Sequence, residues 1–157
     1  MLNVVLADTQ ISVMYATYHY LFWRPVSAID PSSVSADGYG PVPGVDDGSS
    51  ATVEQAGWRP LVATPNHPEY PAAHGCASSS AMEVVRDVYG NKNVAFDFTS
   101  TVTGTTHHFQ RTEELLDEIH NARVWGGMHF RTSVDVGMDQ GKQVARWMTQ
   151  NYFRPVD

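Results

Sequence analysis

The stretch that decides the interpretation of this sequence is HPEYPAAHGCASSS, residues 67–80. Its Pro-x-x-His-Gly element runs directly into small residues, and residues 74–89 are predicted to form a helix with Gly90 as its C-terminal cap. The first backbone N–H groups of a helix have no partner within it, and together with the helix dipole they favour anions. His74 is therefore predicted to lie at an anion site at the start of this helix.

Helices are also predicted on both sides of this stretch. Residues 3–23 are apolar and aromatic all round, which is typical of a buried helix. Arg24-Pro25 ends it, because proline disfavours the α conformation in the residue before it. Thr112-Glu113-Glu114 opens a helix that runs to about Trp125, since acidic residues suit a first turn, and residues 132–151 form the last helix. The sequence thus predicts an all-α helical bundle.

Two segments between these helices lack a helical pattern. Residues 26–70 hold six of the nine prolines, together with Gly, Ser and Asp clusters, and are predicted to be a long irregular loop between the first two helices. A loop of that length is usually functional or disordered. Residues 94–109 are rich in Phe, Val and Thr, and we expect an extended excursion there rather than a sheet.

Composition excludes several classes of function. At 157 residues the chain is the size of one domain, and its net charge of −7 with scattered arginines argues against nucleic-acid binding. Cys76 is the only cysteine, which excludes an internal disulfide and a cysteine-based zinc site. No apolar stretch approaches the length of a membrane span. No signal peptide is evident, because Asp8 interrupts the first apolar run, and no compartment is assigned.

Two arginines and two histidines stand at points where helices are predicted to begin or end. Arg24 precedes a proline, His74 begins a helix, and Arg123 and His129 flank a Gly-Gly bend six residues apart. The guanidinium of arginine offers a planar fork of donors that suits phosphate-like oxygens. Histidine can act as nucleophile, acid or base near neutral pH. Together these four side chains predict a pocket for a tetrahedral oxyanion.

Three segments in this order resemble the signature of vanadium-dependent haloperoxidases and type 2 phosphatidic acid phosphatases. That signature is a Lys, six residues and Arg-Pro; then Pro-Ser-Gly-His; then Ser-Arg, five residues, His, three residues and Asp. Arg24-Pro25 matches the first part, Pro71-Ala72-Ala73-His74 matches the ends of the second, and Arg123 with His129 matches the third. The residues within and around these motifs are similar to those of the bacterial and plant haloperoxidase-like branch in particular.

The resemblance covers residues 15–150 and implies a helical bundle of the haloperoxidase/phosphatase type. Members of the family are usually longer, with helices before the first motif. Residues 1–157 are therefore expected to be a single domain or the C-terminal half of a larger haloperoxidase-like domain. A chain of this kind could complete its core with a second copy, as a homo-oligomer.

The resemblance also implies roles for the four side chains. Arg24 and Arg123 would bind oxygens of vanadate, the implied cofactor, or of phosphate in the same site. His129 would bond vanadium or attack phosphorus, and His74 would be the acid/base. The substrates would be peroxide and halide, or a phosphate ester.

The sequence departs from the signature at several positions. Thr17 stands for its lysine, Ala72 and Ala73 for its serine and glycine, and Ser133 for its aspartate, with Asp135 and Asp139 as the nearest carboxylates in sequence. Three functions remain open. Peroxide-dependent halide oxidation comes first, phosphomonoester hydrolysis second, and a non-catalytic anion-binding or structural descendant third.

Simpler interpretations exist for each residue. Arg24 could cap the end of a helix, His74 could be an ordinary helix residue, and His129 could be a core histidine whose nitrogens are satisfied. Arg123 could form a surface ion pair with one of three nearby acidic residues: Asp117, Glu118 or Asp135.

Two further features carry weaker signals. His107-His108, with His120 and Asp117, suggests a metal site, but adjacent histidines cannot easily face one ion. Cys76 is expected to be a small packing residue, because a thiol nucleophile needs a lowered pKa and a base beside it.

Overall fold

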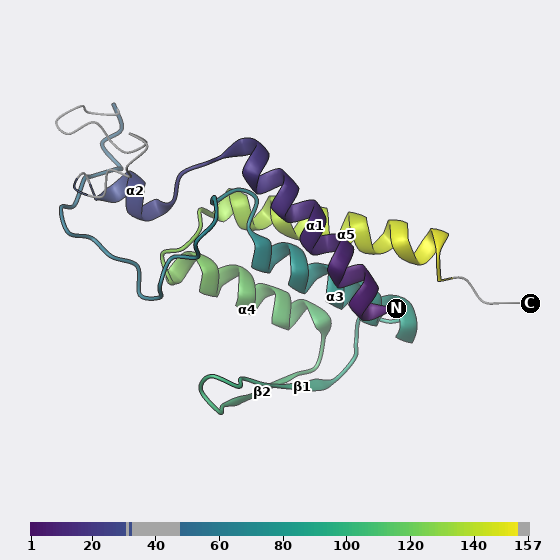
Figure 1. The fold of residues 1–157 in the computed structure, drawn as a ribbon. Coiled ribbons are helices and arrows are strands. Elements are labelled where there is room, and N and C mark those ends of the chain that lie inside the picture. The colour runs from purple at the N-terminus through teal and green to yellow at the C-terminus, as the bar shows by residue number, and fades with distance from the viewer. Residues whose placement is uncertain (31, 33–47, 154–157) are drawn as a thin grey trace, which may run out of the picture.

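The computed structural model describes residues 1–30, 32 and 48–153 (Figure 1). Within these residues, four long helices form a bundle, a short helix lies at one end and a two-stranded hairpin projects from its side, which confirms the predicted all-α bundle. No helix in the described part is both long and apolar enough to cross a membrane. In chain order the elements are α1 (Leu2–Tyr20), α2 (Pro25–Ile29), α3 (Ala73–Tyr89), β1 (Phe96–Thr99), β2 (Thr106–Phe109), α4 (Thr112–Trp125) and α5 (Arg131–Asn151).

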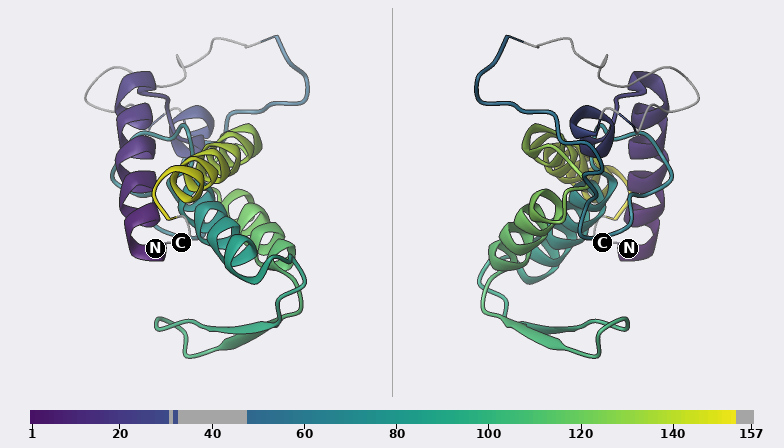
Figure 2. Two further views of the ribbon diagram at one scale, coloured as in Figure 1. Left: turned by 90° about the vertical axis from the view of Figure 1, so that its right-hand side faces the viewer. Right: turned by 90° about the vertical axis from the view of Figure 1, so that its left-hand side faces the viewer.

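The centre of the bundle is α3, which contacts α1, α4 and α5 (Figure 2). Its contact with α5 is close enough that glycine is required on α5. A Cβ atom on Gly137 would overlap the carbonyl of Ala72, and one on Gly141 would overlap the carbonyl of Cys76. The two backbones are also bonded through Ser79, whose Oγ donates to the carbonyl oxygen of the α5 residue Met138 at 2.7 Å.

Three helices lie where the sequence predicted them. The α3 helix starts one residue before the predicted 74–89, and Gly90 adopts the left-handed conformation of a C-terminal cap, with φ of 61°. Helix α4 ends at Trp125 as expected, and α5 starts one residue before the predicted position.

The first helix ends earlier than expected. Leu21 has a left-handed backbone, with φ of 49°, and its N–H donates to the carbonyl of Thr17. The chain then runs extended to Arg24, which becomes the N-terminal cap residue of α2, with Pro25 in the first turn. Proline is favoured there because its missing N–H would have no helical partner.

The expectation that α1 is buried all round was wrong for this chain. Only the face of α1 formed by Val5, Thr9, Val13 and Thr17 is buried. On the opposite face Tyr15 is 77% exposed. Apolar residues on all sides of a helix do not indicate which side packs against another element. Among the described elements only α3 and α5 contact α1.

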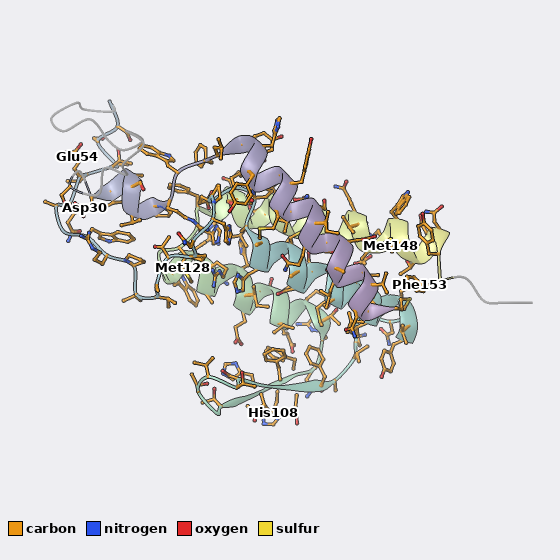
Figure 3. All side chains as sticks on the ribbon, in the orientation of Figure 1. Asp30, Glu54, His108, Met128, Met148 and Phe153 are labelled. Atoms are coloured by element: carbon orange, nitrogen blue, oxygen red, sulfur yellow. The ribbon has the colours of Figure 1, made fainter. Side chains whose placement is uncertain are left out.

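The expected extended excursion at residues 94–109 is in fact a hairpin. Strands β1 and β2 pair antiparallel, with Phe96 opposite Phe109. Their ring centroids lie 5.3 Å apart, and cross-strand aromatic pairs of this kind stabilise two-stranded sheets. The hairpin projects from the side of the bundle, as the position of His108 shows (Figure 3).

The described part of the predicted loop 26–70 contains α2 and otherwise neither helix nor strand. The loop returns to one end of the bundle. The N–H of Leu61 donates to the carbonyl of Gly126 at 3.1 Å, and the N–H of Glu69 donates to the carbonyl of Phe22 at 3.0 Å. Met128 lies at this end, away from Met148 (Figure 3).

Candidate oxyanion site

The four predicted side chains come from the ends of different helices. Arg24 precedes α2, His74 lies in the first turn of α3, Arg123 lies in the last turn of α4, and His129 lies just before α5. The loop that carries Glu69 closes against the same end of the bundle. The arrangement therefore gathers residues that are more than a hundred positions apart in sequence.

Arg24 connects two of these chain segments and is only 7% exposed. Its Nη1 donates to the Met128 carbonyl at 2.9 Å and to His129 Nε2 at 3.0 Å. Its Nη2 donates to the carbonyls of His67 at 2.8 Å and Pro68 at 3.3 Å, and its Nε also reaches the His67 carbonyl, at 3.2 Å. Its acceptors thus lie in two loops and not in α1, so Arg24 does not cap that helix.

Burial lowers the pKa of Arg24 to about 10, and the charge of Glu69 opposes the shift. The guanidinium therefore remains protonated at neutral pH and keeps all of its donors.

His129 is buried and has a partner on each ring nitrogen. Its Nδ1 lies 2.9 Å from Glu69 Oε1, which also accepts the Phe130 N–H at 3.0 Å. Both side chains have no exposed surface. Burial lowers the pKa of His129, while the hydrogen bond to Glu69 opposes that shift.

Sequence reasoning did not identify Glu69 as a site residue. The signature places a carboxylate after His129, where Asp135 and Asp139 are the nearest in sequence, whereas the one that contacts His129 comes from the loop before α3. Asp135 instead pairs with His120 at 2.9 Å. The signal available was a carboxylate enclosed by prolines in HPEYP, a segment already singled out.

Arg123 differs from Arg24 in having unused donors. Its Nε and Nη2 are buried and have no hydrogen-bond partner among the described residues. Among the described residues Arg123 forms no ion pair with Asp117, Glu118 or Asp135; Glu118 pairs instead with His107 at 2.7 Å, and Asp135 pairs with His120 at 2.9 Å. Burial lowers the pKa of Arg123. A buried cation with free donors is energetically costly until an acceptor binds it.

His74 lies on the solvent-facing side of this group. Partial burial lowers its pKa to about 4, and the charges of Arg123, His129, His67 and Arg24 contribute in that order. His67, which the sequence did not suggest, joins the same group, and burial followed by the charge of Arg24 lowers its pKa as well.

We expect this group of histidines to make the protein less stable in mild acid. Below about pH 6.5 the unfolded chain binds protons at His67, His74 and His129. The folded protein does not, because the pKa of each is lowered. Proton binding then favours the unfolded state, so the unfolding free energy should fall as pH decreases from 6.5 to about 5.

Urea unfolding between these pH values measures the effect. His74→Gln should flatten the dependence, and His108→Gln, on the exposed hairpin, should leave it unchanged. A flat profile for the wild-type protein would contradict the lowered histidine pKa values.

The weaker candidates do not form sites in the described part of the chain. No group of three or more His, Cys, Asp or Glu side chains could hold a metal ion there, and His107 and His108 bond separate carboxylates. Cys76 is fully buried, and burial raises the pKa of its thiol to about 12, as expected for a packing residue. A cavity of about 430 Å³ beside α1 and α5 is lined by none of the four predicted residues.

The residues at three of the positions that depart from the signature have contacts within the bundle. Thr17 is fully buried, and its Oγ1 donates within α1 to the Met14 carbonyl at 3.0 Å. Ser133 Oγ donates to the Glu69 carbonyl at 3.1 Å. Ala72 is buried against α5, where its N–H donates to the Ser133 carbonyl at 3.0 Å. All three side chains serve packing or backbone bonding.

Helix ends and the loop before α3 thus gather two guanidinium groups, three imidazoles and one carboxylate at one end of a helical-bundle domain. A family model described as "VCPO second helical-bundle domain" matches residues 1–157. The chain belongs to this family, the second helical-bundle domain of vanadium haloperoxidases.

Solved structures agree with this assignment. A bacterial vanadium-dependent iodoperoxidase is similar to it with a TM-score of 0.55 and 29% identity, over 59% of this chain and 23% of that one. A holo-type bacterial vanadium-dependent chloroperoxidase shares the fold with a TM-score of 0.52 and 22% identity, over 60% of this chain and 23% of that one. The match thus spans about a quarter of each peroxidase. The sequence matches no curated protein.

Proposed function

We propose that this domain binds vanadate, or phosphate in the same place, and that with vanadate it supports peroxide-dependent halide oxidation. The observation that carries the proposal is Arg123, whose Nε and Nη2 are buried without a partner among the described residues. With Arg24 it brings two positive charges, against the single negative charge of Glu69. A tetrahedral oxyanion would supply both the missing acceptors and the missing charge.

The residues present fit such an anion. Arg123 would hold its oxygens, and Arg24 would join by turning Nη1 from His129 Nε2 toward the anion. That movement frees the Nε2 lone pair, so His129 can bond the central atom. When bound, vanadate supplies a Lewis acid that activates peroxide toward halide.

His74 is the group placed to move protons. Its low pKa keeps the imidazole neutral at pH 7, so it can accept a proton from an incoming peroxide. A bound anion would offset the charges of the arginines around it and raise its pKa. A neutral base on the open side of the site fits a substrate that arrives from solvent.

Hydrolysis of a phosphate ester would use the same groups, with His129 as nucleophile. The related structures favour the peroxidase, because their names describe an iodoperoxidase and a chloroperoxidase. A domain that binds the anion without turnover is favoured by one observation: Thr17 points its hydroxyl into its own helix and supplies no donor to the site.

Three parallel measurements on the full chain separate these functions: vanadate affinity, iodide and bromide oxidation with peroxide, and hydrolysis of p-nitrophenyl phosphate. We expect saturable vanadate binding that phosphate competes with, together with halide oxidation that His129→Ala abolishes. Phosphatase activity alone would favour a phosphatase in place of the peroxidase. Binding without turnover would favour a non-catalytic anion-binding domain. Absence of any vanadate or phosphate binding would refute the site itself.

A further inference from the structure

The contact of His129 with both Arg24 and Glu69 determines where the imidazole carries its proton. Arginine has only donors, and Arg24 Nη1 lies 3.0 Å from His129 Nε2. Nη1 also lies 3.5 Å from Nδ1, so the shorter contact marks Nε2 as its acceptor, and the position of the proton depends on the partner of Nδ1. In a neutral imidazole whose Nε2 accepts, the proton is on Nδ1.

Glu69 is placed to accept that proton in a hydrogen bond. Its Oε1 lies 2.9 Å from Nδ1 and 3.0 Å from the backbone nitrogen of Phe130, an obligate donor. The Phe130 N–H identifies Oε1 as an acceptor. Nδ1 of His129, which lies against the same oxygen, must then be its second donor. Neither side chain has exposed surface, so solvent does not compete for the bond.

The backbone of Glu69 is held on both sides. Its N–H donates to the Phe22 carbonyl at 3.0 Å, and its carbonyl accepts Ser133 Oγ at 3.1 Å. Ser133 thus occupies the position after His129 where a carboxylate was expected, and it fixes the residue that supplies the carboxylate instead. The carboxylate that contacts His129 thus comes from another chain segment, and Ser133 Oγ bonds the backbone of the residue that carries it.

We infer that Glu69 is the positioning residue of this site, which keeps the His129 proton on Nδ1 and leaves the Nε2 lone pair available to an oxyanion. Only one part of this inference rests on the proposed function, namely that a bound oxyanion uses the Nε2 lone pair. Glu69 itself does not touch the anion. Once Arg24 turns toward a bound anion, Glu69 is the one remaining described partner that holds the ring in this tautomer.

The direct test is the ¹⁵N spectrum of the imidazoles in protein labelled with ¹⁵N-histidine, with His129→Asn to assign the signals. In anion-free protein at pH 7.5 we expect Nδ1 of His129 to be protonated and Nε2 not. A proton on Nε2 would overturn the inference. This measurement needs no vanadate, so it remains decisive even if the proposed function fails.

Two variants then test the role of the carboxylate. Glu69→Leu leaves the Nδ1–H without an acceptor, and we expect loss of the single tautomer with phosphate present. Phosphate and vanadate affinity should fall roughly 10- to 100-fold, the usual effect of removing the group that orients a ligand histidine. A folded Glu69→Leu protein with wild-type tautomer and affinity would overturn the inference.

Glu69→Gln keeps an acceptor and covers the case in which the leucine variant does not fold. Its amide oxygen can take both N–H groups, so the tautomer should persist with only a few-fold loss of affinity. The Nδ1 proton should move to lower chemical shift, because a neutral acceptor forms a weaker hydrogen bond than a carboxylate. An unchanged Nδ1 proton shift would count against Glu69. Glu54→Gln, on the exposed loop (Figure 3), is the matched control and should change nothing.

Discussion

Arg123→Met is expected to weaken vanadate binding by roughly 100-fold or more without making the protein less stable. Loss of one charge-assisted donor to an oxyanion costs about 2.7 kcal/mol or more, which is this factor in affinity. The same change removes buried guanidinium nitrogens that have no partner in the described, anion-free protein. Burial of an unpaired cation destabilises a fold, so its replacement by an apolar side chain should leave the Tm equal or higher.

Isothermal titration with vanadate and a thermal melt of the same samples measure the two effects together. Arg146→Met is the matched control: it removes the same charge from the exposed part of α5, where Arg146 pairs with Glu83, and should leave affinity unchanged. If Arg123→Met lowered the Tm by several degrees and bound vanadate normally, Arg123 would be a structural residue.

Gly141→Ala is expected to cause the largest loss of stability, by about 1–3 kcal/mol or more. The new Cβ would overlap the carbonyl of Cys76 and the Oγ of Ser79, both on α3. Backbone atoms cannot rotate out of the way as a flexible side chain can, so α3 and α5 would have to separate. The higher helix propensity of alanine would offset only about 1 kcal/mol. Urea unfolding gives the change in free energy.

Gly104→Ala separates this overlap from backbone strain. Gly104, in the turn of the hairpin, has φ of 71° and open space where a Cβ would be built. Its substitution tests strain alone, and we expect the smaller loss. Equal losses for the two variants would mean that the α3–α5 contact is looser than the structure has it.

The positions of α3, α4 and α5 were predictable from the sequence. Residues 74–89 combine a small-residue start with a glycine cap, and α5 has a clear apolar face, so local signals and tertiary packing agree. The burial of α1 was not predictable, because its apolar residues have no helical periodicity to mark a face. The hairpin was missed because residues 94–109 do not show which residues of an extended segment pair with one another.

For the candidate site, sequence order and spacing predicted Arg24, His74, Arg123 and His129, and each of them lies where a helix begins or ends. The partner of His129 could not be selected in that way. Glu69 is 60 residues away from it, and only the path of the intervening loop brings the two together. Nor could the sequence reveal that one arginine finds its acceptors within the protein while two buried donors of the other have no partner among the described residues.

Arg24 bonds to carbonyls on two loops as well as to the histidine. Any ligand that recruits its Nη1 therefore exchanges one hydrogen bond for another, and gains only the difference in strength between them. A halide ion gains little from such an exchange, whereas a multiply charged oxyanion gains more. An oxyanion site of this kind would thus discriminate by charge density, so that halide ions would not compete with the oxyanion for Arg24.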